Sequence, residues 1–527
     1  MSKKTKICLL FLILFAASFF RFWQLKSIPP GLYPDEAING NEAYLFPGKV
    51  FYPENGGREG LFINLVSLSF KIFGPSAFSI RFVSAFFGVL TVLGLYLLSK
   101  EIFYHFSEEK REIVSLLASF FLATSFWHTN FSRIGFRGIL LPFVLVFWLY
   151  FLLLGYRKQK GWPIILSGIF FGLGFYTYSP FRLAVFFLLA IWIYLWLQER
   201  RKNLKQFIIF SAKFLLPAFL VALPLGIYFL CHPQDFFGRL GPISIFAQKD
   251  FISAFRESLF KHLLMFNFAG DRNWRHNISG SPQLFWPIGV FFVIGILIFS
   301  NRFYISLEEK DKKAFFYFIP LFGFFIFLLP GILTYEGIPH SLRTIGTIPF
   351  VYLFAGFSSF WLFEKIKKIV SKYKCSSFFL KTFVVVFLLF ILTNQANRYF
   401  ILFAKNENVK GAFTNNFVKM GKHLASLEKD VKKYVIVNEN GVPISWLNEI
   451  PMPAQTLVFE EISKYGEIRA IYLKPEDVNK IEIEKGTKTV IMLMREDENI
   501  IKHLNTLYPG GSLWCKDPII ELVYVQE

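Results

Sequence analysis

Cysteine is scarce in this sequence of 527 residues, and the four that occur show no functional spacing. Cys8, Cys231, Cys375 and Cys515 form neither a CxxC pair nor a Cys/His pattern, so neither a zinc site nor a disulfide framework is expected. Acidic residues are also few, with 37 Asp and Glu against 57 Lys and Arg. A Gly-rich phosphate-binding loop of the Walker type is missing as well, so no nucleotide-binding loop is predicted.

Apolar residues, by contrast, make up 54% of the chain, with 70 Phe and a mean hydropathy of +0.45. Long uncharged runs recur, each about the ~20 residues that cross a bilayer as a helix. The net charge of +20 belongs to this apolar part, because residues 401–527 carry a net charge of −2. Lys and Arg in membrane loops set topology. The sequence therefore predicts a polytopic membrane protein with lipids, not nucleic acid, as its surroundings.

The hydrophobic pattern predicts about eleven transmembrane helices. The six connections expected inside hold 23 Lys and Arg, whereas the three short outside ones, near 128–137, 178–182 and 333–343, hold four. This asymmetry predicts a cytoplasmic N-terminus and an outside C-terminal part in the plasma or inner membrane. The first run is interpreted as a retained helix rather than a cleaved signal peptide. The predicted spans are 7–23, 77–99, 113–127, 138–155, 163–177, 183–198, 207–230, 284–300, 314–332, 344–363 and 380–396.

The composition changes after Asn397, which predicts two domains: a transmembrane domain at 1–396 and a small α/β domain outside the membrane at 397–527. Two outside loops of the first domain, 24–76 and 231–283, are long. The thirteen apolar residues 61–73 are short for a span and predict a helix lying in the interface. The second domain has four strand-like segments, at 431–437, 469–473, 488–494 and 519–525.

Two adjacent carboxylates, Asp35 and Glu36, follow a Pro-Pro-Gly turn in the first outside loop. Pro34 stands where a short helix is expected to begin. In one interpretation, Asp35 merely caps this helix and complements its dipole. In the other, the pair is functional, and the cations expected on the same side of the membrane favour that reading.

Those outside cations are arginines. The inside connections hold 18 Lys and 5 Arg, but the four cations of the short outside connections are Arg133, Arg137, Arg182 and Arg343. Either residue would satisfy topology, whereas only arginine offers a planar fork with two hydrogen bonds for phosphate oxygens. Arginines near helix ends can instead reach for lipid headgroups.

Histidines and other polar groups accompany these arginines on the predicted outside face, among them His128, Tyr178, His276 and His340. No two histidines have the i, i+4 spacing of a helical zinc site. The sequence therefore predicts no metal site and no required cofactor, although a divalent ion held by Asp35 or Glu36 stays an alternative.

Carboxylates and arginines that open onto a membrane suit one reaction class. Arginines can hold a lipid phosphate that carries a sugar, and a carboxylate can deprotonate the attacking hydroxyl. A positioned base typically contributes ~10²–10⁴-fold, and cations stabilise charge where it develops.

Five stretches carry a resemblance to a known family: 34–37 (PDEA), 57–61 (GREGL) through 73–74 to 81–85 (RFVSA), 127–137 (WHTNFSRIGFR), 176–182 (YTYSPFR) and 337–343 (GIPHSLR). They resemble the GT-C membrane glycosyltransferases, in particular the glycosyltransferase family 39 group of protein O-mannosyltransferases and lipid A aminoarabinose transferases. The resemblance covers the membrane part to about residue 363. It implies a GT-C helical bundle with interfacial helices in the first outside loop.

The resemblance also implies a reaction: inverting transfer of a sugar from a polyprenyl-phosphate donor to a lipid, glycan or protein hydroxyl at the outer face. It makes Asp35 the catalytic base, and Glu36 a residue that positions the acceptor or supports Asp35. Candidate substrate or donor-phosphate contacts are Arg58, Glu59, Arg133, Arg137, Tyr178, Arg182, His340 and Arg343, with His128, Arg275 and His276 as weaker candidates.

Two other functions stay open. A transporter or flippase for a lipid-linked or anionic substrate is the main alternative, but such proteins tend to show repeated halves and ionisable residues near the bilayer midplane. Here no internal repeat is found and most charges fall at predicted helix ends. A membrane scaffold that only displays the outer domain would leave the paired acids without a role.

Overall fold

The computed structural model describes residues 1–199, 204–238, 243–372, 377–484 and 486–525. Some sequence predictions concern residues outside these ranges. Four of the predicted inside cations lie there, namely Arg200, Arg201, Lys202 and Lys374, and so does Cys375. So do residues 239–242 of the 231–283 loop and residues 485 and 526–527 of the C-terminal domain.

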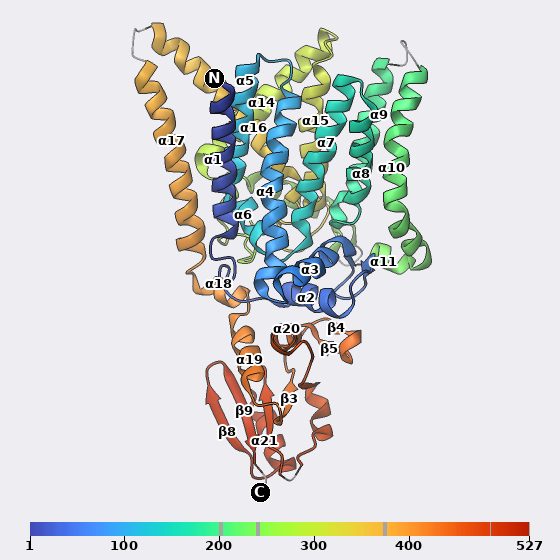
Figure 1. Cartoon of the computed structure of the whole chain (residues 1–527), viewed down its shortest axis with the longest axis vertical. Helices are drawn as coiled ribbons and strands as arrows, with labels where there is room; N and C mark the ends of the chain where they lie inside the picture. Colours follow the sequence, from blue (N-terminus) through green and yellow to red (C-terminus); the bar gives the residue numbers. More distant parts are fainter. Residues whose placement is uncertain (200–203, 239–242, 373–376, 485, 526–527) are drawn as a thin grey trace.

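The membrane part is a bundle of long helices that run side by side along the long axis of the molecule (Figure 1). Within the described residues, nine stretches are long and apolar enough to cross a membrane. The polytopic helical fold is therefore confirmed. The bundle consists of α1 (Lys3–Phe22), α4 (Ala77–Ile102), α5 (Glu108–Thr124), α7 (Leu140–Lys158), α8 (Gly161–Gly174), α9 (Ala184–Glu199), α10 (Leu204–Cys231), α14 (Trp286–Glu308), α15 (Ala314–Ile332), α16 (Ile348–Lys372) and α17 (Ser377–Asn397).

The two remaining predicted spans correspond to α5 and α8, which are shorter, with 17 and 14 residues. Helix α8 packs closely between α7 and α10. At Gly168 a Cβ atom would lie 2.2 Å from the carbonyl oxygen of Phe214, and at Gly172 it would lie 2.7 Å from that of Ala218. Small residues allow this approach of two helix backbones, which is how apolar helices associate without a hydrophobic driving force.

One end of the bundle carries short helices and loops, which contain the predicted outside connections. They include α2 (Pro34–Leu45), β1 (Phe51–Tyr52), β2 (Arg58–Glu59), α3 (Gly60–Phe73), α6 (Phe126–Arg133), η2 (Ser179–Leu183), α11 (Pro233–Phe237) and α13 (Phe251–Leu264). Figure 1 shows α2, α3 and α11 across this end. The apolar helix predicted at 61–73 is α3, which turns Phe62 and Val66 into a core shared with α2.

The C-terminal part begins with η5 (Arg398–Phe403), α18 (Glu407–Ala412) and α19 (Asn415–Ser426), followed by a five-stranded sheet. The strand order is β6-β3-β7-β9-β8, in which β6, β3 and β7 are parallel and the last two pairings are antiparallel. The bounds are β3 (Lys432–Ile436), α20 (Gln455–Tyr465), β6 (Ile471–Leu473), β7 (Thr489–Leu493), α21 (Glu498–Leu507), β8 (Ser512–Lys516) and β9 (Ile519–Tyr524).

All four predicted strands are present, and β8 was missed. Alternation of side chains builds two cores in this sheet. Val435 and Met492 face α19 and α20, whereas Ile436 and Ile491 face α21. All five residues of β8 are exposed at the sheet edge, whereas β3 and β7 consist almost wholly of buried residues.

The C-terminal domain docks on the membrane part through α20. Asn41 Nδ2 of α2 donates hydrogen bonds to Gln455 Oε1 at 2.8 Å and to the Gln455 carbonyl oxygen at 3.0 Å. A Cβ atom on Gly40 would lie 2.5 Å from the ring of Phe459, so α2 and α20 meet without space between them. The helix that carries Asp35 is therefore packed between the bundle and the C-terminal domain.

Candidate functional site

A cavity of about 470 Å³ lies at the end of the bundle that carries α2. Seven separate parts of the chain line it: the start of α2, the β1–β2 turn, the α6–α7 connection, η2, the region around α11, residues 271–276, and residues 336–343. Its titratable lining residues are Tyr33, Asp35, Glu59, Arg137, Tyr178, Arg182, Asp235, Asp271, Arg272, Arg275, His276, Glu336, His340 and Arg343.

Asp35 faces this cavity. Pro34 begins α2 and Tyr33 is its N-cap residue, so the Asp35 side chain makes no capping hydrogen bond, although it lies in the first turn, where an acid complements the helix dipole. One carboxylate oxygen of Asp35 accepts a hydrogen bond from Asn55 Nδ2 at 2.5 Å, and the other lies 3.5 Å from Arg275 Nη1. The side chain keeps 29% of its surface exposed, so a substrate can reach it.

Glu36 points the other way and does not line the cavity. Both of its oxygens receive hydrogen bonds from Arg81, each at 2.9 Å, and the Gly135 amide donates to it at 2.6 Å. The ion pair is fully buried. Glu36 therefore holds α2 against α4. It lies outside the cavity, where it cannot contact an acceptor directly. A divalent ion at Glu36 would have to displace Arg81.

Four of the predicted arginines line the cavity: Arg275 beside Asp35, and three others that are each held by partners. Arg137 Nε donates to Glu59 Oε2 at 2.8 Å, and its guanidinium lies 5.5 Å from the Tyr178 ring centroid. Arg343 Nη2 donates to Glu336 Oε2 at 2.6 Å. Arg182 Nη1 donates to the Phe236 carbonyl at 2.5 Å and has no carboxylate partner among the described residues.

Three other predicted residues lie outside the cavity, whereas Glu59, Tyr178, His276 and His340 line it. Arg58 is buried, pairs with Glu42 and donates to Asn39 Oδ1 at 2.8 Å. Arg133 is also buried: it donates to three backbone carbonyls, of Phe20, Trp23 and Ile28, at 2.6–2.9 Å. Nδ1 of the buried His128 lies 2.7 Å from Arg21 Nη2. These three side chains stabilise loops and helix ends, and the structure does not bring them to the cavity.

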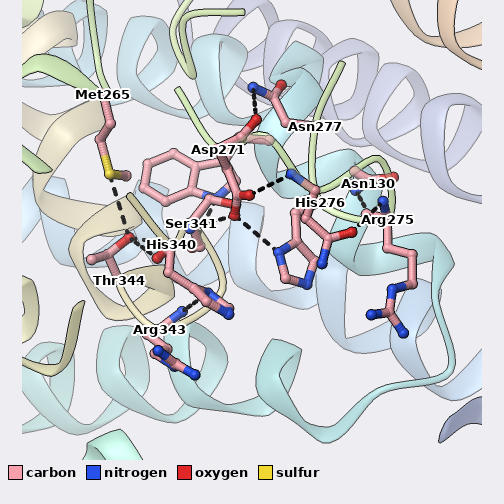
Figure 2. A network of polar contacts seen from close by, with 12 residues as sticks. Asn130, Met265, Asp271, Arg275, His276, Asn277, His340, Ser341, Arg343 and Thr344 are labelled. Carbon is pink, nitrogen blue, oxygen red and sulfur yellow. Dashed lines mark hydrogen bonds and ion pairs between the residues drawn. The ribbon is translucent and has the colours of Figure 1, made fainter. Parts of the chain in front are cut away.

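Asp271 is a cavity residue that sequence reasoning missed (Figure 2). Its Oδ2 accepts hydrogen bonds from His276 Nδ1 at 2.9 Å, from the Ser341 amide at 2.8 Å and from Ser341 Oγ at 2.9 Å. It thereby joins two loops that are 70 residues apart in sequence. Only the polar character of the run 270–277 could have pointed to it.

Burial and neighbouring charge act on the pKa values of this cluster. Burial raises the pKa of Asp271, but His276, His340 and the Asn273 amide outweigh it and hold the pKa well below its usual range. Burial lowers the pKa of His340, and the charges of His276 and Arg343 add to that effect. Asp271 is therefore a carboxylate and His340 a neutral imidazole near pH 7.

Asp271, His276 and His340 also form a group that can hold a metal ion. Their ligand atoms lie within 4.8 Å of one another. A carboxylate and two imidazoles suit Zn²⁺ and related divalent ions. The i, i+4 histidine spacing of a helical zinc site does not apply to this group, because its ligands come from two loops. In the part of the chain that the structure describes, this cluster fits a metal better than the predicted Asp35 and Glu36.

Arg272, Asn55 and Glu336 are further cavity residues that the sequence interpretation left out. Arg272 is exposed and makes no ion pair or hydrogen bond with any described residue. Neither Arg182 nor Arg272 forms an ion pair with a carboxylate of the described residues. Both arginines can therefore hold an anion without first losing a carboxylate partner.

Comparison with known proteins supports the resemblance seen in the sequence. The sequence model of the family described as dolichyl-phosphate-mannose-protein mannosyltransferase matches residues 61–228. No curated protein sequence matches the chain. The matched segment contains α3 to α10 and the arginines of the α6–α7 connection and η2, but not Asp35.

Solved structures share the fold. The apo structure of ArnT from Cupriavidus metallidurans has a TM-score of 0.52 at 11% identity, over 98% of this chain and 97% of that one. The structure of the same protein bound to undecaprenyl phosphate has a TM-score of 0.50 at 12% identity, with the same coverage. The archaeal oligosaccharyltransferase AglB from Archaeoglobus fulgidus, in complex with an inhibitory peptide and a dolichol-phosphate, has a TM-score of 0.51 at 14% identity. The match covers 89% of this chain and 64% of AglB. The chain has the GT-C fold.

Proposed function

We propose that this protein is a membrane glycosyltransferase that moves a sugar from a polyprenyl-phosphate donor to a hydroxyl group of a lipid, glycan or protein. One observation carries the proposal: Asp35 opens into a cavity that also receives Arg137, Arg182, Arg272 and Arg343 from distant parts of the chain. The family match and the GT-C fold support it, as does the lipid phosphate bound in the structures of ArnT and AglB.

In the proposed reaction Asp35 accepts the proton of the acceptor hydroxyl. The hydroxyl oxygen then attacks the anomeric carbon from the side opposite the phosphate, which inverts its configuration. The bond between that carbon and the phosphate oxygen breaks, and the lipid phosphate leaves with the electron pair. Asn55 and Arg275 hold the Asp35 carboxylate in place, through contacts of 2.5 and 3.5 Å.

The phosphate of the donor needs cations that are not already neutralised. Arg182 and Arg272 meet this need, whereas Arg137 and Arg343 each share a carboxylate with the protein, Glu59 and Glu336. We assign the phosphate contact to the first pair and orientation of the donor to the second. Cations at the leaving group stabilise the charge that develops there.

Asp271, His276 and His340 would hold a divalent ion if the enzyme uses one. Such an ion would supply a Lewis acid near the phosphate. Removal of metal by a chelator should then reduce transfer, and Asp271→Asn should reduce the metal content of the purified protein. If metal-free protein has wild-type activity, the role of the cluster is to hold its two loops together.

The proposed topology has the N-terminus in the cytoplasm, and the cavity and the C-terminal domain on the outer face of the plasma or inner membrane. The catalytic unit is residues 1–396, and residues 397–527 form the outer domain, which packs on α2 and does not line the cavity. Thiol labelling of Cys515, which is exposed, tests this side assignment in intact cells. Cytoplasmic labelling would overturn it.

The decisive experiment compares cells with and without the gene by mass spectrometry of surface glycans and lipids. Wild-type protein should restore a missing sugar modification, and Asp35→Asn should not. Glu476→Gln is the matched control, because Glu476 is an exposed carboxylate of the C-terminal domain that makes no ion pair with a described residue. Restoration by Asp35→Asn would exclude Asp35 as the base. An unchanged glycan and lipid profile, with altered transport of a lipid-linked sugar, would favour the flippase alternative.

A further inference from the structure

A second cavity, of about 620 Å³, lies at the opposite end of the bundle from Asp35. It is enclosed by the α4–α5 connection, the end of α14, the start of α15 and the last turns of α16. In Figure 1 these segments lie at the end of the bundle that carries the N-terminus, away from α2. The proposed glycosyl transfer does not use this cavity.

The charge of the cavity lining is strongly positive. Five of its residues are Lys or Arg, and Glu364 is its one acidic residue: Lys110, Arg302, Lys313, Lys365 and Lys368. Lys313 pairs with Asp311 at 2.9 Å, and Glu364 contacts Lys367 only at 3.9 Å. Lys110, Arg302 and Lys365 make no ion pair with any described residue.

The inner wall of the cavity is aromatic. Phe357, Phe360 and Tyr317 are buried there, and Tyr317 Oη lies 3.2 Å from His105 Nε2. The cations therefore form the rim, and rings that continue into the bundle form the floor. A freely dissolved anion needs only the rim, whereas an amphipathic molecule matches both parts.

The electrostatics at His105 agree with an uncompensated positive rim. Burial, followed by the charges of Lys313 and Arg302, lowers the pKa of His105 to about 4, and Asp311 opposes them. An anion in the cavity would cancel part of this positive charge. No acidic residue of the protein takes that role for Lys110, Arg302 or Lys365 within the described residues.

The cavity lies at the level where lipid headgroups are expected. The apolar stretches end at Glu308 in α14 and at Val370 in α16, so Arg302 and Lys365 occupy the last turns of two spans. The Lys365 ammonium lies 5.4 Å from the ring centroid of Trp361, and Trp is enriched where a membrane meets water. Basic pockets between transmembrane helices at such ends bind anionic headgroups.

We propose that this cavity binds the phosphate headgroup of an anionic phospholipid, with Lys110, Arg302 and Lys365 as the phosphate contacts. The predicted topology places it in the cytoplasmic leaflet. The positive-inside rule explains why cations are common at this end of the bundle, but not why three unpaired ones enclose a cavity with an aromatic floor.

The test uses the full-length protein in nanodiscs of phosphatidylcholine with increasing phosphatidylglycerol, and native mass spectrometry to count the lipids retained after release. Wild-type protein should retain phosphatidylglycerol over phosphatidylcholine. The variant Lys110→Gln/Arg302→Gln/Lys365→Gln should weaken this retention by about tenfold or more, since each of these cations adds to the attraction of an anionic headgroup.

The matched control is Lys158→Gln/Lys160→Gln/Lys312→Gln, which removes the same charge from exposed lysines at the same end that do not line the cavity. The control should retain the lipid as wild type does. Equal retention by both variants, or equal loss in both, overturns the proposal. The single variant Arg302→Gln covers the case in which the triple variant fails to fold, and it should show a partial loss.

A second arm distinguishes the source of the phosphate. Inorganic phosphate is added to protein in phosphatidylcholine alone, and thermal stability is recorded for wild type and both triple variants. Stabilisation by phosphatidylglycerol but not by inorganic phosphate supports the lipid assignment. Stabilisation by inorganic phosphate, lost in the cavity variant and without a preference for phosphatidylglycerol, would assign the same cations to a soluble anion and overturn it.

Discussion

Two groups of arginines lie near the end of the bundle that carries α2, and their surroundings are opposite. Arg81 and Arg133 are fully buried, and every strong contact they make is with the protein. Arg182 and Arg272 line the cavity and have no carboxylate partner among the described residues. The first group stabilises the loops that build the cavity, and the second leaves its charge for a ligand.

Within one motif the two roles lie four residues apart. Arg133 ends α6 and donates to the carbonyls of Phe20, Trp23 and Ile28, whereas Arg137 follows a reversal of the chain and faces the cavity. The same contrast separates Asp35 from Glu36, because neighbouring helix positions point about 100° apart. An arginine on the predicted outside face is therefore not by itself a substrate contact.

The largest effect is expected at Asp35. Asp35→Asn removes the proposed base and keeps the size of the side chain, so transfer should fall by ~10²–10⁴-fold or more. The thermal stability should stay close to that of wild type, because this side chain is partly exposed. Turnover of purified protein and its melting temperature are the two measurements. Near-normal turnover of Asp35→Asn would show that Asp35 is not the base and would contradict the functional contrast between Asp35 and Glu36.

Glu36→Gln should show the reverse pattern. It leaves Arg81 as a buried charge without its carboxylate, which typically costs about 3–5 kcal/mol of stability. The expected result is a lower melting temperature and poor yield, with any residual activity in proportion to folded protein. A stable Glu36→Gln protein that has lost transfer would instead show a direct role in the reaction.

Arg343→Lys and Arg133→Lys compare an arginine that lines the cavity with a buried one. Lysine keeps the charge but loses the fork, and hydrogen bonds to a charged group contribute roughly 1.5–3 kcal/mol. Arg343→Lys should therefore reduce kcat/KM by about 10–100-fold with little change in melting temperature. Arg133→Lys should lower the melting temperature and leave the kinetics of the folded fraction unchanged. Equal changes of kcat/KM and of melting temperature in the two variants would contradict the contrast between a cavity arginine and a buried one.

The smallest effect is expected at Arg272. This side chain is exposed and unpaired with described residues, so Arg272→Gln should leave stability unchanged. Because exposed ion pairs contribute up to about 1 kcal/mol, the KM for the donor should rise by about two- to fivefold. Measuring KM at low and high salt checks the electrostatic origin. A KM that does not change in low salt would assign the phosphate contact to Arg182 alone.

Much of the fold could be predicted, because apolar runs of span length and the short apolar runs of the strands are local patterns. The predicted helix ends were too early at α16, where Lys365 and Lys368 continue the helix beyond the apolar run. The edge strand β8 was missed because its five residues are all exposed, so it lacks the buried apolar run that marks β3 and β7. The parallel order of β6, β3 and β7 depends on crossovers that no local pattern encodes.

The candidate site could be predicted only in part. The position of Asp35 in an acidic pair after a turn, and the arginines of three short connections, were visible in the sequence. The buried roles of Arg58, Arg133 and His128 were not, because their partners lie in other segments, such as Phe20 for Arg133. Asp271 was missed for the same reason, since its partner Ser341 is 70 residues away.

The sequence by itself determined that this chain is a polytopic helical membrane protein with an acidic pair and arginines at one end, because hydropathy and charge distribution act locally. Only the tertiary structure decided which of those groups share a cavity and which form buried contacts with other protein groups. The physical reason is that a guanidinium or carboxylate has the same chemistry everywhere, and its availability to a ligand depends on the partners that folding brings within hydrogen-bond distance.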